Sequence, residues 1–249
     1  KDDVYFLYDC TEENGLLVGY SRQLGYQVCI EQGLVKPLLK GEDVHRYDHL
    51  LTDRFVIFPY KLESGKAILY TEKEIGDLFP KGYNYLKRCE DVLRTREKGR
   101  FNIDGEWFQY SRKQGILFAK FEKLVAPDIS MGGNFAYDEK GIFYQTTTVY
   151  GYVKRMEVKE GYKFWLALFN SRLFWWYLKN TGTVLANGFF RFKPDYIKPF
   201  PVPEMQQTSK GEKIVERLTD FLLYLYDKNS TDILTHTSNK RLATHIEEI

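Results

Sequence analysis

The stretch that most constrains the fold of this chain covers residues 161–203, GYKFWLALFNSRLFWWYLKNTGTVLANGFFRFKPDYIKPFPVP. Its first part, residues 164–179, carries apolar or aromatic side chains on every face of a helical wheel, interrupted only by Asn170, Ser171 and Arg172. A helix that is apolar all round lies inside a protein core or spans a membrane. Because basic residues leave no uninterrupted apolar run near the roughly 20 residues that a bilayer requires, we predict a buried aromatic helix.

The second part of this stretch predicts a strand with two different faces. Residues 189–193 read Phe-Phe-Arg-Phe-Lys, so aromatic and basic side chains alternate before Pro194. Alternate residues of a strand point to opposite sides, so this strand can bury its rings and present its cations. Arg191 and Lys193 are therefore candidates to contact a polyanion.

The composition supports a mixed fold. Aromatic residues make up 16% of the 249 residues, including 19 Tyr and 18 Phe, which favours strands over a plain helical bundle. The amphipathic residues 213–226 and a weaker segment after residue 230 predict a C-terminal helical pair. We therefore predict an α+β fold of twisted, mainly antiparallel β-sheets around a buried aromatic helix. The expected domains are residues 1–203 and a helical extension over residues 204–249.

Turn signals predict two hairpins. Asn14-Gly15 separates two short apolar runs and is a strong hairpin signal. Residues 135–150 alternate in the period-two pattern of a strand, with turn composition at residues 138–141. We therefore predict a second hairpin there, following a glycine-containing loop over residues 130–134.

The cysteines and the N-terminus bear on location. The three cysteines are widely spaced and form no CxxC pair, so we expect reduced residues of a cytoplasmic protein and no zinc site. The chain starts at Lys1 without a methionine or a signal peptide. We expect a piece of a longer polypeptide.

Charge is distributed unevenly along the chain. The formal net charge is +2, yet residues 1–60 carry −4, residues 81–120 carry +5, residues 151–203 carry +6 and residues 204–249 carry −2. Two basic, aromatic-rich segments between acidic ends are typical of a module that binds a polyanion such as DNA. The candidate phosphate contacts are Arg46, Lys61, Arg96, Arg112, Lys113, Arg155, Arg191 and Lys193. The candidate base-reading residues, on the loop and hairpin of residues 130–150, are Asn134, Gln145 and Thr147.

Searches for catalytic motifs leave one enzymatic alternative. Pro127-Asp128 followed by Asp138-Glu139-Lys140 satisfies the spacing of a Mg²⁺-dependent nuclease, in which two carboxylates hold the ion and a lysine stabilises charge. Asp138-Glu139-Lys140-Gly141 also has the composition of a turn. His45 and His49 lack a plausible third metal ligand, so we expect surface or structural roles for them. No glycine-rich nucleotide loop, HExxH or GxSxG motif occurs, and we expect no catalytic residue in this chain.

Several ordered blocks resemble a known family. The blocks CIEQGLVKPLLKGEDVHRYD, FVIFPY, LFPKGYNYLKRCEDVLRTR, EWFQYSRKQG, KLVAPDIS, FWLALFNSRLFWWYLKNTG and GFFRFKPDYIKPFPVP follow one another between residues 1 and 203. In order and spacing they resemble the TaqI-like C-terminal specificity domain. That domain is the target recognition part of adenine-specific DNA methyltransferases and of type IIG restriction-modification enzymes.

The resemblance implies a division of labour. A separate upstream methyltransferase domain would bind S-adenosylmethionine and flip the target adenine, and a nuclease domain in the parent protein would bring Mg²⁺. This module would bind double-stranded DNA and read its bases, with no cofactor of its own. The resemblance also places Lys40, Arg46, Tyr47 and Arg191 at recurrent block positions. A protein-interaction module whose aromatic surface docks another chain is the remaining alternative.

Overall fold

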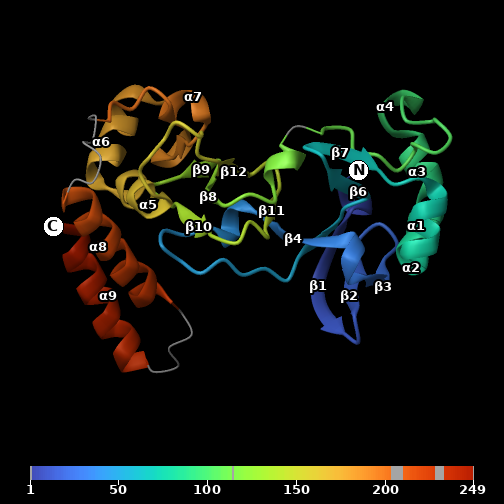
Figure 1. Cartoon of the computed structure of the whole chain (residues 1–249), viewed down its shortest axis with the longest axis horizontal. Coiled ribbons are helices and arrows are strands. Elements are labelled where there is room, and N and C mark those ends of the chain that lie inside the picture. The colour runs from blue at the N-terminus through green and yellow to red at the C-terminus, as the bar shows by residue number, and fades with distance from the viewer. Residues whose placement is uncertain (1, 114, 203–209, 228–232, 249) are drawn as a thin grey trace. The chain divides into compact units, whose positions relative to one another are not determined.

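The computed structural model describes residues 2–113, 115–202, 210–227 and 233–248, and it divides the chain into two compact units (Figure 1). The first unit comprises residues 1–38, 52–120 and 142–144, and the second comprises residues 39–51, 121–141 and 145–249. Each unit has its own hydrophobic core. Both units are assembled from segments that are far apart in the sequence, a division that the sequence pattern did not indicate. The predicted boundary between a DNA-recognition domain (residues 1–203) and a helical extension (residues 204–249) is a functional division, and it stays a prediction.

The first unit is built on a twisted sheet of six strands in the order β11-β4-β5-β1-β2-β3. The pairs β1–β2, β2–β3, β1–β5 and β4–β5 are antiparallel, and β6–β7 form a separate antiparallel hairpin. Asn14 (φ 50°) and Gly15 (φ 79°) join β1 to β2 with positive φ at both positions, so the predicted hairpin is confirmed. The strands are β1 (Phe6–Glu13), β2 (Leu16–Ser21), β3 (Tyr26–Glu31), β4 (Val35–Leu39), β5 (Phe55–Ile57), β6 (Tyr60–Glu63), β7 (Lys66–Leu69) and β11 (Tyr144–Gln145).

Short helices follow β7 in the first unit, and one of them, α2 (Pro80–Arg88), packs beside β3 (Figure 1). Thr71 caps the first of them, because its hydroxyl accepts a hydrogen bond from the Glu74 amide at 3.2 Å while the Glu74 carboxylate accepts from the Thr71 amide. Trp107 and Phe108 are completely buried in the core of this unit. The helices are α1 (Glu72–Leu78), α2 (Pro80–Arg88), α3 (Glu90–Arg94) and α4 (Arg96–Gly99), with 3₁₀ turns at Asp2–Val4, Gln32–Leu34 and Ile116–Phe118.

The second unit contains two small antiparallel sheets, one in the order β10-β8-β12 and one formed by β9 and β13. All five residues of β8 are buried, as expected for the central strand of a sheet whose two faces are covered. The strands are β8 (Lys123–Pro127), β9 (Ile129–Ser130), β10 (Ala136–Asp138), β12 (Val149–Tyr152) and β13 (Phe190–Arg191).

The hairpin predicted over residues 135–150 is wrong. The turn exists, with the Gly141 amide donating to the Asp138 carbonyl at 3.3 Å. However, β10 pairs with β8, whereas β11 belongs to the six-stranded sheet. Alternation identifies a strand by its two faces, but it does not identify the strand to which it is hydrogen-bonded.

The aromatic stretch forms two helices instead of the single predicted one. Ser171 is extended (φ −70°, ψ 155°), and its hydroxyl accepts a hydrogen bond from the Phe174 amide at 3.1 Å, so it begins a second helix. Leu166, Phe174 and Leu178 are completely buried, but Trp176 is 61% exposed. The helices here are α5 (Tyr162–Asn170), α6 (Arg172–Thr181) and α7 (Pro194–Ile197), with 3₁₀ turns at Gly41–Asp43 and Ala186–Gly188.

The predicted C-terminal helical pair is confirmed as α8 (Lys210–Tyr226) and α9 (Ile233–Glu248), which pack against each other (Figure 1). The pair belongs to the second unit, because α8 packs on α5 and the Thr219 hydroxyl donates to the Lys163 carbonyl at 3.1 Å. The second core includes Leu222 and Leu225 of α8. Mixed helices and mainly antiparallel sheets confirm the α+β class. Among the described residues, no helix is both long enough and apolar enough to cross a bilayer.

Candidate nucleic-acid interface

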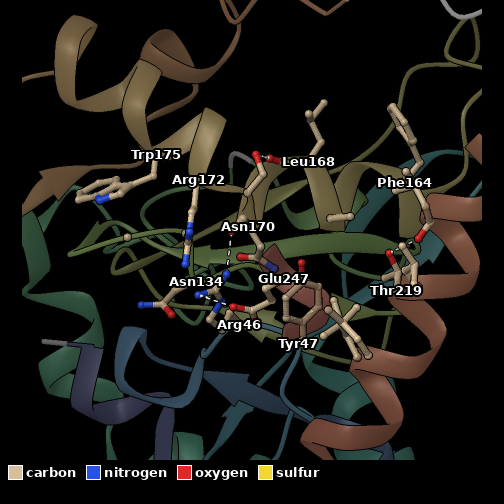
Figure 2. Close-up of a pocket in the computed structure, with 18 of the residues that line it drawn as sticks. Arg46, Tyr47, Asn134, Phe164, Leu168, Asn170, Arg172, Trp175, Thr219 and Glu247 are labelled. Atoms are coloured by element: carbon tan, nitrogen blue, oxygen red, sulfur yellow. Dashed lines mark hydrogen bonds and ion pairs between the residues drawn. The ribbon is translucent and has the colours of Figure 1, made fainter. Parts of the chain in front are cut away.

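A cavity of about 580 Å³ in the second unit is lined by two of the polar residues expected to contact DNA, Arg46 and Asn134 (Figure 2). We call it the Arg46 cavity. Its walls come from the loop before β10, from both sides of the junction between α5 and α6, and from α8 and α9. The polar side chains that line it belong to Arg46, Asn134, Asn170, Ser171, Arg172, Thr219 and Glu247.

The loop before β10 is fixed by close packing against α5. A Cβ on Gly133 would meet the Phe169 carbonyl oxygen at 2.6 Å and the Asn170 Cα at 2.8 Å, so no larger residue fits without moving the backbone. The Asn134 side-chain amide donates to the Ser130 hydroxyl at 2.7 Å. This bond holds a half-buried amide at the wall of the cavity, where Figure 2 shows its side chain.

Asn170 joins the loop to the helix. Its side-chain oxygen accepts a hydrogen bond from the Phe135 amide at 2.9 Å, and its side-chain nitrogen donates to the Phe135 carbonyl at 2.9 Å. The side chain is buried, and it bonds the peptide groups on both sides of Phe135 as a neighbouring strand would. The Tyr47 amide donates to the same carbonyl at 3.1 Å. Asn170 therefore fixes the wall of the cavity.

Arg46 reaches the cavity from a segment distant in sequence. Its Nη2 donates to the Asn170 backbone carbonyl at 2.8 Å, and its Nη1 lies 3.3 Å from the Glu247 carboxylate (Figure 2). The carbonyl is at the C-terminal end of α5, where the helix dipole favours a cation. The Nε atom of Arg46 has no hydrogen-bond partner among the described residues. The side chain is one-third exposed and is therefore positioned but still accessible.

The side chains of Arg46, Asn134 and Arg172 all line this cavity (Figure 2). Guanidinium groups donate to guanine edges or to phosphates, and an amide both donates to and accepts from an adenine edge. The aromatic ring of Trp175 lines the same cavity. This combination of groups is suited to nucleic acid, and the structure brings together two residues predicted for it, Arg46 and Asn134.

The predicted strand cations are exposed and partly paired. Arg191 is in β13, with Nη2 3.7 Å from the Asp128 carboxylate, and its side chain is 46% exposed. Lys193 lies 2.7 Å from the Asp195 carboxylate, which raises the pKa of the Lys193 ammonium group. Phe190 and Phe192 are buried, so the alternation of rings and cations predicted from the sequence is present.

Among the candidate phosphate contacts of the first unit, Arg96 is buried and has a structural role. It is 3% exposed, and its guanidinium donates to the carbonyls of Leu93, Trp107 and Gln109 at 2.9, 3.0 and 2.9 Å. It stacks on the Phe101 ring at 4.6 Å. A buried arginine whose donors are satisfied by the backbone does not reach a phosphate, so the assignment of Arg96 to DNA contact is corrected.

The other cations of the first unit lie on its surface. Lys61 forms an ion pair with Glu74 at 2.7 Å, and this contact is the main reason why the pKa of Glu74 falls to about 2. Arg112 and Lys113 are exposed, and the Lys113 ammonium lies 5.9 Å from the Tyr60 ring. These three remain available for phosphate contact.

Four further candidates lie elsewhere in the second unit. Lys40 is half-buried, and its backbone amide donates to Asp43 at 2.7 Å. Gln145 does not line the Arg46 cavity, and its Nε2 is buried without a hydrogen-bond partner in the described part of the chain. Thr147 and Arg155 are exposed. The base-reading group predicted from the incorrect hairpin therefore does not assemble at this cavity, and only Asn134 lies there.

The structure does not bring together the residues that the nuclease alternative requires. Asp138 pairs with Lys123 at the beginning of β8, at 2.5 Å with both side chains 1% exposed, and burial lowers the pKa of that lysine. Asp128 follows the other end of β8, about 16 Å away at the rise of a strand. Glu139 and Lys140 are exposed in the turn after β10. Within residues 2–113, 115–202, 210–227 and 233–248, no three His, Cys, Asp or Glu side chains are placed to hold a metal ion.

His45 and His49 share a separate hollow of about 190 Å³ with acidic residues, and both are exposed. The hollow is also lined by Asp43, Asp48 and Asp227. These groups do not form a metal-binding cluster among the described residues, so nothing in their geometry assigns them more than the surface or structural role expected from the sequence.

Three adjacent residues of the cavity wall were not among the predicted site residues. Asn170, Ser171 and Arg172 interrupt the apolar run, and all three line the Arg46 cavity. The interruption is visible in the sequence as a polar triplet. It marks the break between α5 and α6, and its side chains line a cavity wall. A polar triplet inside an otherwise apolar run was therefore the available signal.

Comparison with known families gives one match. The family model of the TaqI-like C-terminal specificity domain matches residues 36–202. The matched region includes β4 through α7 and contains Arg46, Asn134 and Arg172. No curated protein matches the chain.

Proposed function

The chain belongs to the family of TaqI-like C-terminal specificity domains, and on this premise we propose that it selects the DNA target of a type IIG restriction-modification enzyme or an adenine-specific methyltransferase. The family membership makes it a DNA-specificity domain of restriction-modification enzymes. The geometry supports a role in binding, because the cavity presents guanidinium and amide groups.

The observation that carries the proposal is the convergence of Arg46, Asn134 and Arg172 on one cavity. Base edges in the major groove are distinguished by pairs of donors and acceptors, which these side chains provide. Phosphates need only exposed cations, and Arg191 and Lys193 provide them on β13 and just after it. We assign base reading to the cavity and backbone contact to the strand.

The chemistry would belong to another part of the protein. We propose that an upstream methyltransferase domain binds S-adenosylmethionine and holds the flipped adenine, and that this domain is also the partner of the present chain. Mg²⁺ would be needed where the parent protein carries a nuclease domain. The chain itself would need neither cofactor.

A binding selection tests the proposal. The 249-residue protein is incubated with a pool of duplexes that contain a randomised segment, and bound duplexes are recovered and sequenced. We expect enrichment of one short motif, because specificity domains favour particular base pairs by about 1–3 kcal/mol each. Recovery of unselected sequences at every salt concentration would contradict it.

The salt dependence distinguishes DNA recognition from protein docking. Between about 50 and 200 mM salt, each neutralised phosphate lowers the affinity about 3.5-fold, so four contacts predict a loss of roughly a hundredfold. A flat dependence would oppose phosphate contacts. Incubation of plasmid with Mg²⁺ tests the nuclease alternative, since cleavage that Lys140→Ala abolishes would favour it.

A further inference from the structure

A second hollow lies on another face of α5 and has a different lining. This groove of about 610 Å³, which we call the α5 groove, is formed by α5, β12, the segment after β12 and α7. Tyr162, Trp165 and Phe169 of α5 lie three and four residues apart and form one wall. The other apolar residues that line it are Leu124, Tyr152, Val153, Val158, Pro194, Ile197, Phe200 and Val202.

Three cations line this groove. Lys154 and Arg155 belong to the segment after β12, and Lys198 follows α7. The Lys154 ammonium donates to the Glu160 backbone carbonyl at 2.6 Å. None of the three forms an ion pair with a carboxylate of the described chain, and no acidic side chain lines the groove. The groove therefore attracts an anionic ligand.

The apolar walls determine what kind of anionic ligand fits. No Asn, Gln, Ser, Thr, Asp or Glu side chain lines the groove in the described structure. The hydroxyl groups of its two tyrosines are occupied, since Tyr152 donates to the Phe192 carbonyl and Tyr162 donates to the Glu122 carbonyl at 2.7 Å. The described lining of the groove has no Asn, Gln, Asp or Glu acceptor, so the amino and imino donors of a nucleobase buried here would lose their hydrogen bonds to water without replacement, at a cost of about 1–3 kcal/mol for each group. Burial of an aliphatic or aromatic side chain loses no hydrogen bonds to water and does not carry this cost.

We propose that the α5 groove binds an acidic segment of a partner polypeptide, with a large apolar side chain of that segment inserted between Trp165 and Phe200. Carboxylates on either side of the anchor pair with Lys154, Arg155 and Lys198. A hydrophobic anchor flanked by charges of complementary sign is a general mode of peptide recognition. The volume of the groove accommodates a few side chains, which suits a short linear segment. This site is independent of DNA recognition, although it removes Arg155 from the expected phosphate contacts.

A peptide selection on the 249-residue protein tests the proposal. Phage-displayed random peptides of about 12 residues are selected on the wild-type protein, and those recovered are measured by fluorescence polarisation. The test variant carries Lys154→Glu and Lys198→Glu. The matched control carries Lys140→Glu and Lys179→Glu, two exposed lysines outside both the groove and the Arg46 cavity. Circular dichroism establishes that both variants are folded.

We expect the recovered peptides to be enriched in Asp and Glu around Leu, Phe or Trp. Their affinity should fall at least about tenfold in the test variant and by less than about twofold in the control. Peptides that bind both variants equally, peptides without acidic enrichment, or failure to recover any peptide would overturn the proposal. A single-stranded oligothymidylate is tested as a second ligand. If the wild-type protein and the control variant bind it and the test variant does not, the groove is a nucleic-acid site and the peptide proposal is overturned. The duplex selection described above is scored separately, so each proposal can fail alone.

Discussion

The Arg46 cavity and the α5 groove are two hollows of similar volume that share one helix and differ in chemistry. The cavity is lined on α5 by Phe164, Ala167 and Leu168, and the groove by Tyr162, Trp165 and Phe169 of the same helix. Both contain cations. The cavity adds the amide of Asn134 and polar groups at the end of the helix, whereas the groove adds only aliphatic and aromatic surface.

This difference shows that positive charge alone does not define a DNA site. Cations attract phosphates and carboxylates alike, and their partner is decided by the groups between them. Amides and guanidiniums beside the charge compensate the desolvation of base edges, while apolar walls compensate only the burial of apolar groups.

The largest expected effect comes from removing the residue that holds the cavity wall. Asn170→Ala deletes two buried hydrogen bonds to Phe135, and we expect a loss of about 3 kcal/mol in the free energy of unfolding. Urea denaturation measures it. Asn180→Ala is the control, because Asn180 makes an exposed bond to the carbonyl of Trp176 within α6, and a loss below about 0.5 kcal/mol is expected. Equal losses in the two variants would show that the Asn170 bonds do not stabilise the loop.

The next effect separates the two hollows by function. Arg46→Ala should weaken binding of the selected duplex by about 1–3 kcal/mol, since a positioned guanidinium at the cavity is lost. Binding of the acidic peptides to the α5 groove should stay within about twofold of wild type. Titrations of the same preparation with duplex and with peptide measure both. A parallel loss of both would mean that the hollows are one functional site.

A smaller and uniform effect is expected for the strand cation. Arg191→Ala should weaken binding to all duplexes by a similar factor, on the order of 1 kcal/mol, and reduce the salt slope by about 1, because it contacts a phosphate. Binding isotherms at several salt concentrations measure the slope. Lys140→Ala, in an exposed turn, is the control. A loss of affinity for only one duplex sequence would indicate that Arg191 contacts a base and not a phosphate.

The smallest change in overall affinity is expected for Asn134, whose replacement should instead change which duplex sequences are preferred. Asn134→Ala removes one amide from the cavity, so binding to a mixed duplex pool should change less than about twofold while the ranking of individual sequences shifts by about 1 kcal/mol. Competition between the selected duplex and its single-base variants measures this ranking. A uniform loss across all competitors would make Asn134 a structural residue, acting through its bond to Ser130.

Local patterns identified much of the architecture. Asn14-Gly15 predicted a hairpin and the alternation at residues 189–193 predicted a strand with buried rings and exposed cations, and both are present. Each depends on backbone preference or side-chain period over a few residues. The same patterns failed at residues 135–150, because a strand's partner lies elsewhere in the chain.

The candidate site was predicted only in part. Arg46 and Asn134 were expected to contact DNA, but Arg96 was expected as well and is buried. Nothing in the residue types distinguishes Arg46 from Arg96, since both are basic residues in polar segments. Burial separates them, because the carbonyls around Arg96 satisfy its guanidinium inside the first unit.

The sequence by itself determined the family, the mixed fold class and the existence of an aromatic helical stretch with basic neighbours. The tertiary structure decided where that stretch breaks, which faces of α5 line a hollow and which cations remain accessible. The contact between Arg46 and Asn170 joins residues 124 positions apart. Period and propensity are local properties of the chain, whereas convergence over such a separation depends on how the helices and sheets of the second unit pack.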